Sequence, residues 1–184
     1  KYNALQNQIN PHFLFNSFNV LSELVYENQD LAVKFIQQLS DLYRYVLSVK
    51  SEDLVPIKKE LDFIESFAFL LKTRFENQLE ITIDVEPKEG DFLVPMSLQL
   101  LVENAVKHNE ATSATPLKIS ISRQNGSIVV TNNLQLKTAV TTSTNTGLSN
   151  ITERYAYLSG KEIEINKSET TFEVRLPIIH VNEK

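Results

Sequence analysis

The sequence predicts an α+β protein in which an N-terminal helical hairpin precedes an α/β sandwich, a mixed sheet with helices on one face. Three observations predict this class. Apolar residues recur at helical spacing through roughly the first 78 residues. Strand and helix patterns then alternate to about residue 178. The dipeptide Asn125-Gly126, between two alternating runs, is the strongest short signal of a β-hairpin.

Composition restricts the classes of protein to consider. The 184 residues suit one ordinary domain or two small ones, and 42% hydrophobic against 22% charged residues is typical of a packed core. The lack of cysteine excludes disulfides and thiolate catalysis and favours a reducing, cytoplasmic setting. A net charge of -5 without a basic cluster argues against nucleic acid as a partner. No apolar run approaches the roughly 18 residues of a membrane span. Because the first residue is Lys1 and not Met, we expect a piece of a longer protein.

The first expected helix contains the stretch QINPHFLFNSFN at residues 8–19. Apolar residues recur on one face of this helix and polar residues on nearly the opposite face. The apolar stripe comprises Leu14, Phe18, Leu21 and Val25, and the polar stripe comprises His12, Asn16, Asn19 and Glu23. Pro11 either bends the helix and turns His12 outward, or stands at the first helical position with Asn10 as the cap. The pattern leaves both interpretations open.

A second helix is expected after the turn ENQD, with Asp30 as its N-cap. Its apolar face comprises Leu31, Phe35, Leu39, Leu42, Val46 and Val49. Two helices joined by so short a turn form an antiparallel hairpin, which cannot bury two apolar faces alone. A second copy that completes a four-helix bundle is the simplest solution. We therefore predict a dimerisation hairpin at residues 1–52, with the boundary in KSED at 50–53.

The second part, residues 53–184, is expected to begin with a third helix that Pro56 opens. The apolar stripe of this helix comprises Ile57, Leu61, Ile64, Ala68, Leu71 and Phe75. Strands are expected at residues 79–86, on both sides of Asn125-Gly126, and in KEIEINK and TTFEVRLPI. Two further helices are expected at residues 97–109 and 148–158. His180 is interpreted as a bystander near a polar C-terminus.

The stretch LVENAVKHN at 101–109 gathers candidate chemistry on one helix face. Glu103, Asn104, Lys107 and His108 fall opposite the apolar residues of the same helix. Hard oxygen ligands such as an amide and a carboxylate suit Mg²⁺, and a lysine one turn further on suits phosphate. The alternative interpretation is the solvated polar face of an amphipathic helix.

The motifs NPHFLFN, LVENAVKH and TGLSNITERY occur in the order and spacing that is typical of LytS-like sensor histidine kinases, and the chain resembles this family over nearly its whole length. The resemblance implies a dimerisation and histidine phosphotransfer hairpin followed by a GHKL-type ATP-binding domain. It also implies transfer of the γ-phosphoryl group of ATP, with Mg²⁺, to a histidine and then to an aspartate of a response regulator. The expected protein is a homodimer and the cytoplasmic domain of an inner-membrane sensor.

Residue by residue, the resemblance implies that His12 is the phosphoacceptor. The spacing puts Asn16 one turn later on the same face, where it would either hydrogen-bond the ring or position a water. Asn104 corresponds to the Mg²⁺ ligand of the asparagine box. The helix face with Glu103, Lys107 and His108 is expected to turn towards the triphosphate. Glu103 is the candidate to orient the attacking ring or accept its proton, and a salt bridge to Lys107 is the alternative.

The nucleotide-binding motifs depart from the family pattern in one place. Asn132 stands where the family has the aspartate that receives the adenine amino group, and TNNLQ lacks the glycines of the first glycine box. Gly147 corresponds to the second glycine box, while Asn150 and Arg154 match the helix after the lid. The lid at 134–147 has no glycine before its end. We therefore expect lower nucleotide affinity, and the alternatives are a non-catalytic signalling module and a GHKL ATPase without phosphohistidine.

Overall fold

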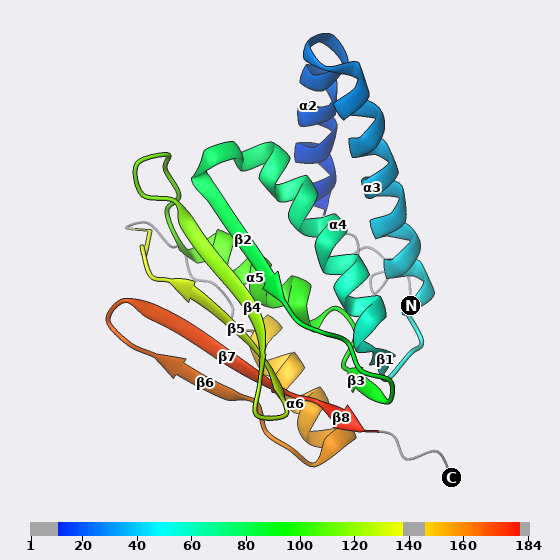
Figure 1. Cartoon of the computed structure of the whole chain (residues 1–184), viewed down its shortest axis with the longest axis vertical. Helices are drawn as coiled ribbons and strands as arrows, with labels where there is room; N and C mark the ends of the chain where they lie inside the picture. Colours follow the sequence, from blue (N-terminus) through cyan, green and yellow to red (C-terminus); the bar gives the residue numbers. More distant parts are fainter. Residues whose placement is uncertain (1–10, 138–145, 181–184) are drawn as a thin grey trace.

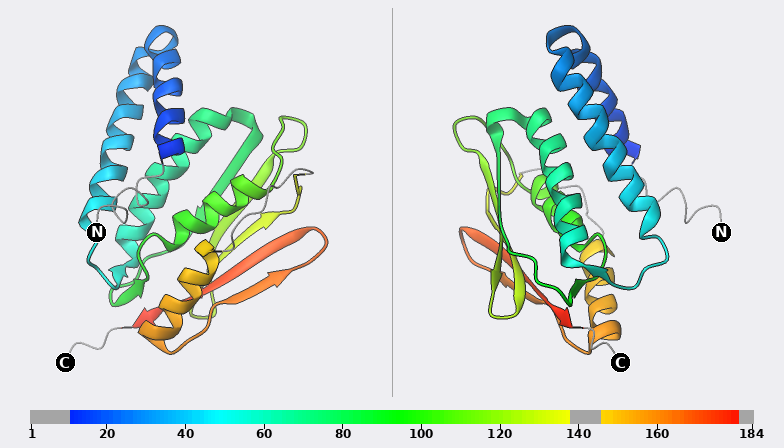
Figure 2. Two further views of the ribbon diagram at one scale, coloured as in Figure 1. Left: turned by 180° about the vertical axis from the view of Figure 1, so that it is seen from behind. Right: turned by 45° about the vertical axis from the view of Figure 1, so that its right-hand side comes forward.

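The computed structural model describes residues 11–137 and 146–180, and it confirms the predicted α+β class (Figure 1). Helices α2 and α3 form the hairpin, and α4, α5 and α6 lie against one face of a mixed sheet (Figures 1 and 2). The helices are α2 (Pro11–Glu27), α3 (Gln29–Ser48), α4 (Ile57–Phe75), α5 (Ser97–His108) and α6 (Thr146–Ser159), with the 3₁₀ helix η1 (Glu76–Gln78) after α4.

The main sheet has five strands in the order β2-β4-β5-β7-β6. Their bounds are β2 (Leu79–Asp84), β4 (Leu117–Gln124), β5 (Ser127–Asn133), β6 (Glu164–Lys167) and β7 (Thr171–Pro177). Strands β2 and β4 are parallel and the other neighbours are antiparallel, so the sheet is mixed as predicted. Asn125 and Gly126 have φ angles of 47° and 77°, the left-handed conformation that a tight turn between β4 and β5 requires.

A small second sheet was not predicted from the sequence. It joins β1 (Val55–Pro56), β3 (Asp91–Leu93) and β8 (Ile179–His180) in the order β1-β3-β8. His180, interpreted from the sequence as a bystander, belongs to this sheet, and its Nδ1 lies 3.2 Å from Oδ1 of the buried Asp91. Asp91 also pairs with Arg123, so this carboxylate connects the last strand with β3 and β4.

The turn of the hairpin differs from the prediction in its cap. Asn28, rather than Asp30, caps α3, and its side-chain oxygen accepts a hydrogen bond from the backbone N–H of Leu31 at 3.0 Å. The apolar face predicted for α3 is confirmed, since Phe35, Leu39 and Val46 are buried.

The apolar stripe predicted for α2 is only partly covered within the chain, since Leu21 packs against the core. Phe18 and Val25 of that stripe are 50% and 46% exposed, whereas Ser17 and Leu24 of the neighbouring stripe are buried. Phe13 belongs to the buried stripe and packs on Phe67 of α4, with 5.3 Å between ring centroids. The helix is apolar on two adjacent faces, and α3 and α4 cover the one that contains Phe13.

The hairpin and α4 share a continuous core across the predicted boundary at residue 52. Tyr45 of α3 stacks on Phe63 of α4 at 4.3 Å between ring centroids. Buried residues of α3 such as Val46 belong to the same cluster as Ile57 of α4 and the sheet. The division into residues 1–52 and 53–184 therefore stays a prediction, and the packing joins the two parts in this structure.

Candidate functional site

A cavity of about 730 Å³ lies between α5, the start of α6 and the strands β5, β6 and β7. Its volume falls within the range of small-molecule and cofactor sites. Five of the residues predicted for nucleotide binding line it: Asn104, Lys107, His108, Asn132 and Gly147. The structure thus brings together, in one cavity, residues from positions 104 to 147 that the sequence motifs identified separately.

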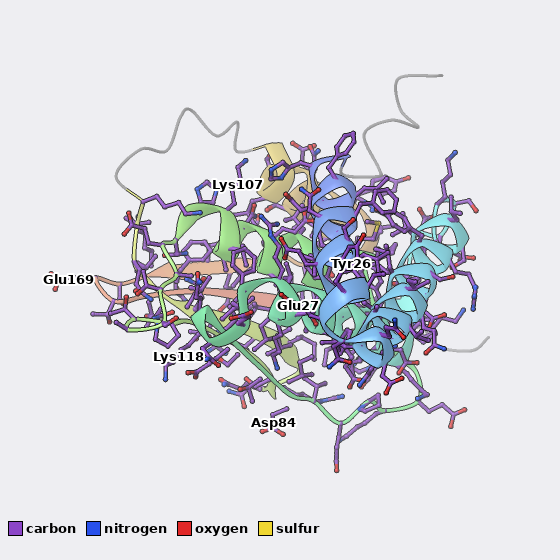
Figure 3. The ribbon with its side chains drawn as sticks, turned by 90° about the horizontal axis from the view of Figure 1, so that it is seen from above. Tyr26, Glu27, Asp84, Lys107, Lys118 and Glu169 are labelled. Carbon is purple, nitrogen blue, oxygen red and sulfur yellow. The ribbon has the colours of Figure 1, made fainter. Side chains whose placement is uncertain are left out.

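Helix α5 supplies one wall of the cavity through its polar face. Leu98, Leu101 and Val102 are buried on the other side of the helix, as predicted. Asn104 is half-buried and Lys107 is exposed, projecting from the C-terminal part of α5 (Figure 3). Within residues 11–137 and 146–180, no three His, Asp or Glu side chains gather as a metal site.

The surroundings of His108 in the cavity shift the pKa of its side chain. Burial lowers the pKa of its imidazole, and the positive charges of Lys107 and Lys137 lower it further. The ring is therefore held neutral at neutral pH, while the neighbouring ammonium groups supply the positive charge.

The described beginning of the predicted lid is attached to the C-terminal end of α5. The backbone N–H of Gln135 donates to Oδ1 of the buried Asn109 at 2.8 Å, and the N–H of Lys137 donates to the carbonyl of His108 at 3.1 Å. The ammonium of Lys137 also donates to the carbonyls of Val106 and Lys107 at the end of the helix. Residues 138–145 of the lid lie outside the described residues.

Asn132 precedes the predicted lid in the sequence, Gly147 stands at its end, and both line the cavity. Asn132 is 5% exposed, and its Nδ2 donates to the carbonyl of Asn133 at 2.7 Å. One N–H of this amide is therefore used within the chain, and Oδ1 is the acceptor group of the side chain. Gly147 lies against α5, and a Cβ placed on it would be 3.0 Å from Cδ1 of Leu100.

Three predicted residues of α5 and α6 lie outside this cavity. Glu103 accepts a hydrogen bond from Nε2 of Gln99 at 3.0 Å, a contact that the sequence analysis did not consider. Asn150 is exposed on α6. Arg154 lines a separate cavity of about 250 Å³ beside the connector after α3, where it donates to the carbonyl of Glu52 at 3.4 Å.

His12 stands apart from the cavity residues on the first turn of α2, where its side chain is exposed. The amide nitrogen of Asn16 lies 3.2 Å from its Nδ1 and 3.3 Å from its Nε2. The two side chains therefore share a face, as their spacing of four residues predicts. The described helix begins at Pro11, and Asn10, the proposed cap, lies outside the described residues.

Several residues of the cavity were missed by the sequence analysis. The walls also contain the apolar side chains of Leu134, Leu136, Ile165 and Phe172, and a second ammonium from Lys167. Alternation within β6 and β7 predicts which of their residues share a face but not that this face meets α5. Asn109, whose side chain accepts a hydrogen bond from Gln135, could have been noticed in the sequence as a second asparagine at the end of the helix motif.

The chain is similar to known histidine kinases. The sequence profile of the histidine kinase family matches residues 1–79. The chain is 38% identical over 140 residues to the sensor protein LytS of Oceanobacillus iheyensis, covering 73% of the chain and 24% of the relative. It is 34% identical over 197 residues to the sensor histidine kinase/phosphatase LytS of Staphylococcus aureus, covering 95% of the chain and 34% of the relative.

The chain thus spans about a quarter to a third of the length of these relatives. Among solved structures, the histidine kinase AdeS of Acinetobacter baumannii aligns with a TM-score of 0.45 at 12% identity, covering 94% of this chain and 98% of that one. Within the described ranges, none of the helices is long and apolar enough to span a membrane.

Proposed function

Because the chain belongs to the LytS-like sensor histidine kinases, we propose that it transfers the γ-phosphoryl group of ATP to His12 and then to an aspartate of a response regulator. The observation that carries the proposal is the cavity in which Asn104, Lys107, Asn132 and Gly147 meet. A dimer, ATP use and a response regulator agree with the family; the residue roles below are our proposal.

ATP binds in the cavity with its base at the apolar strands and its phosphates at α5. Oδ1 of Asn132 accepts a hydrogen bond from the adenine amino group, since Asn132 lines the cavity and an amide oxygen is an acceptor. Ile165 and Phe172 contact the base, because both line the cavity with apolar surface. Leu134, within the stretch TNNLQ that lacks the glycines of the first glycine box, adds a third apolar side chain to the lining.

The phosphates meet positive charge and hard oxygen on α5. Lys107 binds a phosphate oxygen, and the neutral ring of His108 serves as a hydrogen-bonding group beside it. Mg²⁺ would neutralise charge on the triphosphate, and Oδ1 of Asn104 is the group that fits it. Gly147 lets the start of α6 approach α5 closely at this end.

The phosphoryl group moves to a ring nitrogen of His12. The nitrogen lone pair forms a bond to the γ-phosphorus, the bond to the β,γ-bridging oxygen breaks, and ADP leaves with that electron pair. The N–H proton of the second ring nitrogen is lost to Glu103 or to water. Asn16 fixes the ring orientation, because its amide contacts the imidazole at 3.2 Å.

The exposed apolar stripe of α2 is the surface for a second copy of the chain. Phe15, Phe18 and Val25 on α2 and Ile36 and Leu47 on α3 are all more than 40% exposed. A four-helix bundle would cover them. We place this kinase portion on the cytoplasmic side of a membrane-bound sensor, with no role for nucleic acid.

The experiment that tests the proposal is incubation with Mg²⁺ and γ-labelled ATP. We expect an acid-labile, base-stable label that is lost in His12→Gln. A folded, dimeric wild type that takes up no label would contradict the proposal, and calorimetry with an ATP analogue would then distinguish a module that binds no nucleotide. Steady phosphate release that His12→Gln leaves unchanged would instead indicate an ATPase.

A further inference from the structure

A buried carboxylate outside the cavity joins three helices of the chain. Glu60 lies on α4 and has no exposed surface. It accepts hydrogen bonds from the hydroxyl of Tyr45 on α3 and, at 3.1 Å each, from the backbone N–H groups of Met96 and Leu98 at the start of α5. The hairpin and the helix that carries Asn104 therefore meet at one side chain.

The start of α5 needs such a partner because of its backbone conformation. Met96 precedes the helix with a φ of 64°, a left-handed conformation that costs a non-glycine residue energy. The N–H of Met96 points to Oε2 of Glu60, and the N–H of Leu98 points to Oε1. The carboxylate thus fixes both this conformation and the first free N–H groups of α5.

The hydrogen-bond donors around Glu60 favour the charged form of its carboxyl group. Burial raises the pKa of the Glu60 carboxyl, and the hydrogen bonds from Tyr45 and from the start of α5 oppose the rise. Because each of these partners is a donor and a helix N-terminus favours negative charge, the geometry suits the carboxylate. Burial, and then the charge of Glu60, raise the pKa of Tyr45, so its hydroxyl remains a donor.

The link from Tyr45 to Glu60 can be separated from ring packing. The Tyr45 ring stacks on Phe63 at 4.3 Å between centroids, and this contact does not involve the hydroxyl. Removal of the oxygen atom alone would therefore leave the hairpin packed on α4 while it frees the hairpin from the carboxylate that holds α5.

We propose that Glu60 is a positioning residue for phosphoryl transfer, which sets the orientation of the hairpin bearing His12 relative to the helix bearing Asn104 through its bonds to Tyr45 and to the start of α5. The inference rests on the proposed function. Glu60 contacts neither the cavity nor His12, so it acts only through the elements that it joins.

The test compares Tyr45→Phe with Tyr43→Phe as the matched control. The hydroxyl of Tyr43, two residues earlier on α3, is buried with no hydrogen-bond partner among the described residues. We expect Tyr45→Phe to lower the single-turnover rate of His12 labelling about tenfold or more, because a misplacement near 1 Å has effects of this order. Its dissociation constant for an ATP analogue should stay within about twofold of the wild type.

A second variant, Glu60→Gln, keeps the shape but puts an amide donor among groups that all donate. Glu60→Gln should also transfer the phosphoryl group more slowly while it keeps the nucleotide affinity of the wild type. Both quantities are measured under conditions in which denaturant titration shows that every variant is folded. Transfer by Tyr45→Phe that equals or exceeds that of the wild type, or that falls no further than in Tyr43→Phe, would overturn the inference. So would a slower rate matched by an equal loss of nucleotide affinity.

Amide hydrogen exchange gives a readout that does not depend on activity. Exchange of the Met96 and Leu98 N–H groups should accelerate in Tyr45→Phe but not in Tyr43→Phe. Unchanged exchange in Tyr45→Phe overturns the inference even if the wild type is labelled. An unlabelled wild type overturns the proposed function instead, and accelerated exchange would then still support the link from the hairpin to α5.

Discussion

The side-chain amide nitrogen of Asn16 lies 3.2 Å from Nδ1 of His12, one helical turn away on the same exposed face of α2. An amide in this position restricts the orientation of the imidazole ring. Asn16→Ala should therefore slow phosphoryl transfer to His12 by about tenfold without changing nucleotide affinity. The measurement is single-turnover labelling together with calorimetric titration of an ATP analogue.

The control for this prediction is Asn19→Ala, a residue that is also exposed on α2. It changes the polarity of the helix surface without touching the ring contact, so labelling should keep the wild-type rate. An equal loss of rate in both variants would indicate a general effect on α2 and would contradict a role for Asn16 at the imidazole.

Gly147 should not tolerate a methyl group, for a reason of space. The new Cβ would lie 3.0 Å from Cδ1 of Leu100, while the backbone of Gly147 is outside the left-handed region. Alanine in a helix gains up to about 1 kcal/mol over glycine, but overpacking costs roughly 1–3 kcal/mol. Gly147→Ala should thus lower the free energy of unfolding in denaturant titrations and weaken nucleotide binding. The added substitution Leu100→Ala should reverse the second effect, and a failure to do so would contradict this contact.

Asn132 is predicted to decide between adenine and guanine. Its Oδ1 would accept from the adenine amino group, whereas guanine presents a carbonyl oxygen at that position. Asn132→Ala should lower ATP affinity about tenfold, since one hydrogen bond to a buried group is lost, and should leave GTP affinity nearly unchanged. Calorimetric titration of both nucleotides measures the ratio. An equal loss for the two would indicate that Asn132 acts on the fold and not on the base.

Much of the fold could be predicted because its signals are local. The spacing of Phe35, Leu39 and Val46 identifies the buried face of α3, and Asn125-Gly126 identifies the turn between β4 and β5. The face of α2 could not be identified, since two adjacent stripes are apolar and only the position of Phe67 selects the one with Phe13. Strands of two or three residues, such as β1 and β8, are too short to show alternation.

The candidate site could likewise be predicted only where its signals are local or belong to a family motif. Asn104, Lys107 and His108 were found because they belong to one helix turn, and the family resemblance added Asn132 and Gly147. Phe172 and Ile165 come from strands that reach the cavity only through the order of the sheet. Glu60 carried no local signal, because its backbone partners lie 36 and 38 residues away.

The lowered pKa of His108 predicts a pH dependence of stability. Burial and the charges of Lys107 and Lys137 disfavour the protonated ring in the folded state, whereas the unfolded chain protonates near the ordinary value of 6.5. The unfolded state therefore binds more protons below about pH 6.5, and stability falls as the pH falls through that value. Urea unfolding midpoints from pH 7.5 to 5.5 should decline less in His108→Gln than in the wild type. Parallel declines would contradict this role.

Phe15 and Phe18 on α2 should be required for self-association. Their side chains are 69% and 50% exposed, and Leu47 on α3 is 64% exposed, so the hairpin presents apolar surface that the rest of the described residues leave uncovered. Burial of a side chain such as phenylalanine contributes about 1.5–3 kcal/mol, and a carboxylate there would have to be desolvated without a partner. Phe18→Glu should therefore shift the protein from dimer to monomer in sedimentation velocity.

The control for this prediction is Tyr157→Glu, which alters an aromatic residue on α6 that is 88% exposed and should leave the dimer intact. Because the hairpin core around Phe35 and Phe67 is untouched, far-UV circular dichroism should be unchanged in both variants. A Phe18→Glu protein that remains dimeric would place the contact between copies elsewhere on the molecule.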